Sequence, residues 1–91
     1  MGEIAMAKTQ RDLARHALGL SHKRKVSYRN YFVTGKGSCN YDHWVAMVAM
    51  GAARQRKGND LSGGDDVFWL TRDGAEYALN DGEKLSAEDF P

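Results

Sequence analysis

The chain has 91 residues and a net charge of +1; 42% of its residues are hydrophobic, 27% charged and 10% aromatic. This balance fits one small globular domain and excludes a disordered chain. No apolar run approaches the roughly 18 residues that span a bilayer and no signal-peptide pattern is present, while the single Cys39 excludes an internal disulfide and predicts a reducing, cytoplasmic setting.

The net charge hides a division along the chain. Residues 1–57 carry 11 Lys and Arg against three Asp and Glu, a net charge of +8, whereas residues 58–91 carry two against nine, a net charge of −7. Such a division is typical of a basic face for nucleic acid beside an acidic tail. The alternative is two solvated surfaces that partly neutralise each other.

The first predicted helix spans residues 10–18 and follows a start over residues 1–8 that we expect to be disordered. Thr9 is placed to cap this helix, and Leu13 and Ala17 recur at helical spacing. We therefore expect one apolar stripe that faces the core.

The following segment combines a basic cluster with aromatic residues. We expect a short helix over about residues 27–33, because Tyr28 and Phe32 are four residues apart, although a broken strand suits the same residues. Cations that pair with phosphates, next to rings and an amide that contact bases, are typical of nucleic-acid-binding segments. The alternative is that the tyrosines pack in the core and the cluster is solvated. The candidate binding residues here are Lys23, Arg24, Lys25, Tyr28, Arg29, Asn30 and Tyr31.

A second helix is predicted over residues 44–50, with Asn40 or Asp42 as its cap and Gly51 as its end. Its residues are apolar nearly all round, which is typical of a buried helix. We therefore expect it to be the central, most buried helix of the domain.

A hairpin is predicted next, with a basic strand over residues 52–57, a Gly-rich loop over residues 58–66 and an apolar strand over residues 67–71. In the returning strand, alternation predicts Val67, Trp69 and Thr71 on one side and Phe68 and Leu70 on the other. Further candidate phosphate contacts at the base of the hairpin are Arg54, Arg56 and Lys57.

Thr71 is placed to cap a last helix, whose Ala75 and Ala78 return to the core. An acidic tail over residues 81–91 follows, either frayed or with one further helical turn that begins at Ser86.

One pattern covers residues 41–79. A helix that ends in MVAMG is followed by Arg54 and Arg56, a Gly-rich loop, and a strand that ends in LTRDG at residues 70–74. This order resembles the second half of a winged helix-turn-helix domain, in which the returning strand ends in Leu-Thr-x-x-Gly. The resemblance implies a small α+β domain over residues 9–80, with three to four short helices and a two-stranded hairpin wing.

The chain as a whole is also similar to small proteins encoded by phages and prophages, through its segments HALGL, SYRNYFVTG and GGDDVFWLT. Two features depart from the winged-helix pattern. The helix before the wing has few polar groups to read base edges, and the wing loop is acidic, whereas a wing on phosphates should be basic.

The first functional hypothesis is therefore a small nucleic-acid-binding protein with a regulatory role, whose expected partner is duplex DNA. The alternative is a protein-interaction module on the same scaffold, for example a phage protein that inhibits a host factor or nuclease. Acidic groups that mimic phosphates toward a basic partner would then be the contacts. These groups are Asp60, Asp65 and Asp66.

No nucleophile–base pair stands out in the sequence, so we expect no enzymatic activity and no cofactor. Cys39 and His43 are four residues apart but lack two further ligands at suitable spacing, so we expect no metal site either. A monomer and a homodimer are both compatible with the sequence.

Overall fold

The chain folds as a small α+β domain, as the sequence predicts. The computed structural model describes residues 4–58 and 64–90, and in these ranges it contains three helices and three strands. Their order is α1 (Lys8–Leu18), β1 (Phe32–Thr34), α2 (Cys39–Ala49), β2 (Ala53–Arg56), β3 (Asp66–Leu70) and α3 (Arg72–Tyr77). In the described ranges, no helix has the length and apolarity needed to cross a bilayer.

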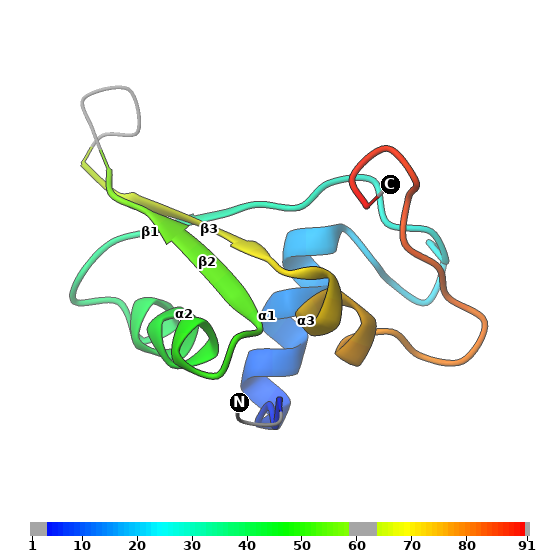
Figure 1. The fold of residues 1–91 in the computed structure, drawn as a ribbon, viewed down its shortest axis with the longest axis horizontal. Coiled ribbons are helices and arrows are strands. Elements are labelled where there is room, and N and C mark those ends of the chain that lie inside the picture. Colours follow the sequence, from blue (N-terminus) through cyan, green and yellow to red (C-terminus); the bar gives the residue numbers. More distant parts are fainter. Residues whose placement is uncertain (1–3, 59–63, 91) are drawn as a thin grey trace.

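The three strands form one antiparallel sheet in the order β1-β3-β2. The predicted hairpin is confirmed by β2 and β3, which pair from Ala53 opposite Leu70 to Arg56 opposite Val67. The helices lie together on one side of this sheet, which leaves its other side uncovered (Figure 1).

The predicted helix over residues 27–33 is wrong. Residues 28–31 are irregular, and the residues after them form β1, in which Phe32 lies opposite Phe68 of β3. The four-residue spacing of Tyr28 and Phe32 suggested a helix. The open edge of β3 instead offers backbone hydrogen bonds to an extended segment, and this tertiary pairing overrides the local pattern.

The end of α1 fixes the irregular segment that leads into β1. The last four carbonyl groups of a helix have no partner within it. Here the Leu18 carbonyl accepts a hydrogen bond from the Tyr28 N–H (3.1 Å), and the Ala17 carbonyl accepts one from the Tyr31 N–H (3.3 Å). Residues 28–31 are therefore held in an extended path against the helix end.

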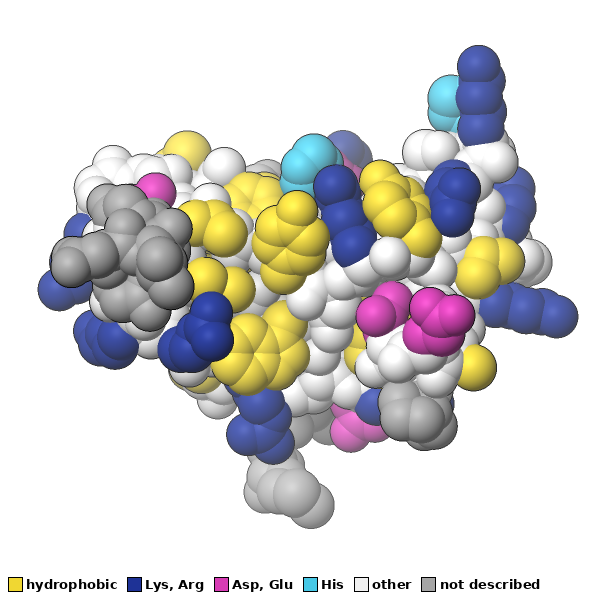
Figure 2. All heavy atoms as spheres, turned by 90° about the horizontal axis from the view of Figure 1, so that it is seen from above, with side chains coloured by type: hydrophobic (Ala, Val, Ile, Leu, Met, Phe, Trp, Pro, Cys, Tyr) yellow, Lys and Arg dark blue, Asp and Glu magenta, His cyan; other side chains and the backbone are white. Residues whose placement is uncertain are grey.

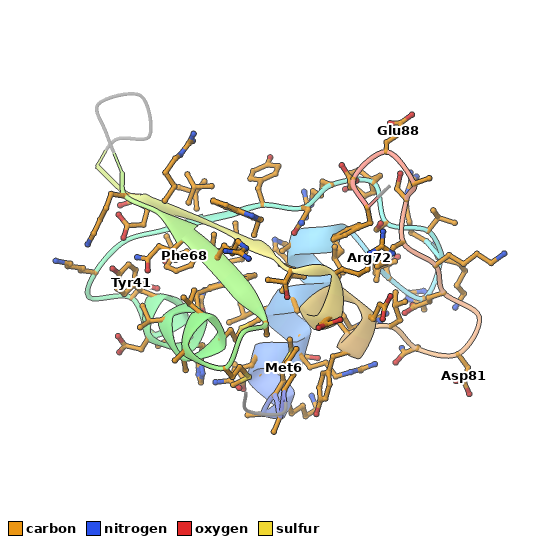
Figure 3. The ribbon with its side chains drawn as sticks, viewed as in Figure 1. Met6, Tyr41, Phe68, Arg72, Asp81 and Glu88 are labelled. Atoms are coloured by element: carbon orange, nitrogen blue, oxygen red, sulfur yellow. The ribbon has the colours of Figure 1, made fainter. Side chains whose placement is uncertain are left out.

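The core lies between the sheet and the helices. Trp44 of α2 is fully buried and stacks on Phe68 of β3, with the ring centroids 5.6 Å apart. Tyr41, in the first turn of α2, packs edge-on against the same phenylalanine, with the ring centroids 5.6 Å apart (Figure 3). Large aromatic side chains dominate the energetics of a small core, so this group links α2 to the middle strand.

The prediction that α2 is the central, most buried helix is wrong. It buries only the residues on one side, and Val45 on the other side is 40% exposed. α1 holds the central place, since it contacts α2, α3 and β3. Small apolar side chains are common at protein surfaces. The apolar residues on every side of this helix therefore did not mean that every side is buried. The cap of α2 is Ser38, whose hydroxyl accepts from the Asn40 N–H, rather than Asn40 or Asp42.

The ends of the chain also contact the core. Ile4 and Met6 pack against it ahead of α1, and α1 begins at Lys8 with the Ala7 N–H bonded to the Gln10 side chain rather than with Thr9 as its cap.

Residues 81–90, expected as an acidic tail, pack onto the domain. Glu83 is held by the guanidinium of Arg15 through two hydrogen bonds of 2.5 and 2.7 Å, and its side chain is 1% exposed. Leu85 and Phe90 pack against the core. A charge-assisted bidentate pair of this kind is among the stronger polar contacts in proteins, so it fastens the C-terminal segment to α1.

At Gly74, α3 lies close against the chain before β2. A Cβ atom at this position would overlap the carbonyl oxygen of Ala52. The same carbonyl accepts the Thr71 N–H at 3.0 Å, and the Thr71 hydroxyl caps the helix by accepting the Gly74 N–H. The backbone therefore has little freedom to give way.

We predict that Gly74→Ala lowers the free energy of unfolding by about 1–3 kcal/mol through overpacking. The direction of the change in unfolding free energy is informative, because Gly→Ala at an open helical position stabilises a protein by about 0.4–1 kcal/mol. Urea unfolding followed by circular dichroism measures the difference, with Glu76→Ala at an exposed position of the same helix as the control. A Gly74→Ala variant as stable as the parent would contradict the close approach.

The Glu83–Arg15 pair also predicts a pH dependence. The hydrogen bond from Arg15, with a second from the Asn80 N–H, holds the pKa of Glu83 at about 2, below its ordinary value of 4.5. A lowered pKa in the folded state means that the stabilisation is complete above pH 4.5 and is lost as the pH falls through about 2.

We expect Glu83→Gln to be less stable than the parent at neutral pH and to lose less stability between about pH 4.5 and 2. Urea midpoints across this range measure both effects, and Glu76→Gln, which removes an exposed carboxylate, serves as the control. If the urea midpoint of Glu83→Gln falls as steeply below pH 4.5 as that of the parent, another group controls the loss of stability in acid.

Candidate nucleic-acid interface

The uncovered side of the sheet, which we call the outer face, carries apolar and cationic side chains. Successive strand residues point to opposite sides. Val67 and Trp69 of β3 share one side, as the alternation predicts, and the structure shows that this side points away from the helices. Val33 of β1 lies opposite Val67, while Arg54 and Arg56 of β2 lie opposite Trp69 and Val67. Figure 2 looks onto this side, where hydrophobic side chains lie next to one another with Lys and Arg side chains among and around them.

Tyr31 extends the outer face by one more ring. The side chain of Asn30 continues the pairing beyond β1, because its amide oxygen accepts the Leu70 N–H (2.8 Å) and its amide nitrogen donates to the Leu70 carbonyl (3.0 Å). Tyr31 lies between Asn30 and the paired Phe32, so its position is beside Trp69 on the neighbouring strand. Its side chain is 55% exposed.

The predicted roles of these two neighbours therefore differ. Asn30, a candidate base contact, has both ends of its amide bonded to the backbone of β3, which makes it a positioning residue for Tyr31. Tyr31 keeps an exposed ring that is open to a ligand. Trp69 was not among the candidate residues, although the alternation of VFWLT already separated it from the core residues of the strand.

Two hollows flank the rings of Tyr31 and Trp69. The larger, of about 550 Å³, lies beside Trp69 and Arg54 at the β2 edge of the sheet. The smaller, of about 240 Å³, lies beside Tyr31, Arg29 and His16 at the β1 edge. Each ring thus shares a hollow with one arginine.

Arg29 and Tyr28 join the outer face to the end of α1. The Arg29 guanidinium donates to the His16 carbonyl at 2.7 and 3.2 Å, and its Cζ lies 5.4 Å from the centre of the Tyr28 ring. The Cζ of Arg24 lies 4.4 Å from the same ring. A Cβ atom at Gly19 would overlap this ring, so Tyr28 packs on the helix end while cations lie over it.

The remaining basic candidates are exposed. Lys23 and Lys25 line, with Arg24, a shallow hollow of the loop after α1. Lys57 follows β2 directly. The structure therefore brings Arg54, Arg56 and the rings together on the outer face. Lys23, Arg24 and Lys25 lie in the loop after α1, which Tyr28 and Arg29 connect to this face.

Asp66, a candidate partner contact, is buried and holds the base of the hairpin. Its carboxylate accepts hydrogen bonds from the Gly58 N–H (2.8 Å), the Gln55 amide (2.6 Å) and the Tyr41 hydroxyl (3.0 Å). These bonds, the one from Gly58 above all, hold the pKa of Asp66 below its ordinary value. Sequence reasoning missed this role because the aspartate follows a polar, Gly-rich loop.

The three aspartates of the hairpin do not form one described surface. Asp66 is internal, Asp65 is exposed with its carboxylate against the backbone of Gly35, and Asp60 lies outside the described residues. In residues 4–58 and 64–90, no three His, Cys, Asp or Glu side chains gather in a way that suits a metal ion.

Comparisons of the chain with family models, curated proteins and solved structures find no match.

Proposed function

We propose that this protein is a non-enzymatic, cytoplasmic nucleic-acid-binding protein on a winged-helix-like scaffold, and that the outer face is its binding surface. The observation that carries the proposal is the pair of rings on this face, the exposed Tyr31 and the half-buried Trp69, beside the exposed cations Arg54 and Arg56. Guanidinium groups pair with phosphates, and aromatic rings offer faces to bases. Both parts of a nucleotide therefore find a matching group on this face.

The position of the hairpin supports the winged-helix-like scaffold. β2 and β3 follow α2 as a wing follows the last helix in that family. The helix itself is poorly suited to a major groove, because its exposed residues include Asp42, Val45 and Ala49, which offer few groups to base edges. α1 and α2 are also separated by residues 19–38, which contain β1. We therefore assign the contact to the sheet.

The alternative of a protein partner at the acidic loop has less support. Asp66 accepts hydrogen bonds inside the hairpin, so its charge is not offered to a partner. Reversing that charge would damage the hairpin whatever the loop binds. A test of this alternative should therefore change only Asp60 and Asp65.

We predict that Arg54→Ala combined with Arg56→Ala weakens nucleic-acid binding regardless of sequence. Fluorescence anisotropy with labelled mixed-sequence oligonucleotides of about 20 nucleotides, at roughly 50 and 200 mM salt, measures the effect. The parent should bind at micromolar concentration or better at low salt and lose affinity steeply with salt. Each lost phosphate contact should reduce the salt slope by about 1.

Lys8→Ala is the control, because it removes an exposed cation at the start of α1, on the helix side of the sheet. It should leave affinity and salt slope nearly unchanged. Equal binding by the arginine double variant and the parent at low salt would remove the outer face from consideration. No binding by the parent would reject nucleic acid as the partner.

A further inference from the structure

We infer that the outer face binds single-stranded rather than duplex nucleic acid, with one base stacked on Trp69 and a second on Tyr31. This inference rests on the proposed nucleic-acid binding and specifies its substrate class. The four observations that support it are the ring positions, the hollows beside the rings, the charge of the face and its width.

The ring positions fit unpaired bases. Tyr31, directly before β1, lies next to Trp69 of β3, because Asn30 and Phe32 on either side of it face Leu70 and Phe68. In a duplex, the faces of a base are covered by its neighbours in the stack. Only an unpaired strand can turn successive bases toward protein rings, and such stacking is tolerant of sequence.

In each hollow, an arginine lines the wall beside one of the two rings. The hollow of about 550 Å³ beside Trp69 and Arg54 is open to solvent at the β2 edge of the sheet. Beside Tyr31, the second hollow is lined by Arg29 and His16. A base on each ring would thus place its own phosphate within reach of a guanidinium, as a nucleotide strand requires.

The charge of the outer face also favours a polyanion. The outward-pointing residues of the three strands all belong to the described ranges, and none of them is acidic. They are Val33, Arg54, Arg56, Val67 and Trp69.

The width of the face is unfavourable for a duplex. The major groove of B-DNA is about 12 Å wide and admits a helix or a two-stranded ribbon. Here the rings lie on and beside β3, which is the middle strand of three. β1 and β2 on either side would meet the groove walls before Trp69 could reach the bases, whereas an unpaired strand can lie flat across the sheet.

Anisotropy with four labelled probes of equal length tests this inference: oligo(dT), oligo(rU), and their duplexes with complementary strands. The single strands should bind more tightly than the duplexes. Trp69→Ala and Tyr31→Ala should each weaken single-strand binding about five- to one-hundredfold. Tyr77→Ala, which removes a tyrosine of α3 that is 41% exposed, is the matched control and should bind as the parent does.

A second measurement observes the stacking directly. Trp44→Phe leaves Trp69 as the only tryptophan, and it is expected to fold because the buried Nε1 of Trp44 has no hydrogen-bond partner in the described structure. Addition of oligo(dT) should quench the Trp69 fluorescence in proportion to binding. Saturation without any change in emission would overturn the stacking of a base on Trp69.

The outcomes separate the two claims. Tighter binding of the single strands, with loss in both ring variants, supports the inference for DNA or for RNA, according to the probe. Duplex binding at least as tight as single-strand binding, unaffected by the ring variants, overturns the inference but leaves the proposed function intact. Failure of the parent protein to bind any probe overturns both.

Discussion

The structure depends on the pairing of β3 with a strand along each of its edges. Because β3 is the middle strand, one of its sides builds the core and the other builds the outer face. Phe68 points inward and joins the rings of Trp44 and Tyr41, while Trp69, the next residue, points outward. A one-residue slip in this register would exchange the two sides. The same pairing that positions the core therefore positions the candidate binding surface.

Three segments far apart in the sequence meet on the outer face only because of this pairing. The edge toward β1 is secured by Asn30, whose amide takes the place of a backbone partner for Leu70, and by the end of α1, which holds residues 28–31. The edge toward β2 is secured by the buried carboxylate of Asp66 at the base of the hairpin. Asn30 and Asp66, which the sequence suggested as binding residues, thus hold the edges of the sheet together. The rings and arginines between these edges lie on the outer face.

The sequence predicted those elements whose conformation depends mainly on neighbouring residues in the chain. The helix over residues 10–18, the hairpin and the alternation that separates Phe68 from Trp69 all follow from short-range periodicity and are present. The strand β1 was only the alternative to a predicted helix over residues 27–33, because its conformation depends on the open edge of β3 rather than on its own residues. The Arg15–Glu83 pair joins residues 68 positions apart, and no short-range sequence pattern predicts such a contact. The candidate site was partly predicted for the same reason: Tyr31, Arg54 and Arg56 were named, but Trp69 joined them only through the sheet.

The most direct test of the central claim is a nuclear magnetic resonance titration of the ¹⁵N-labelled protein with a short single-stranded oligonucleotide. If the outer face is the binding surface, the shifts that change most should be the indole N–H of Trp69 and the backbone amides of residues 31–33, 54–56 and 67–69. The amides of α2 and α3 on the opposite side should change little. Changes concentrated in α2 would instead indicate a recognition helix and contradict the assignment of binding to the sheet.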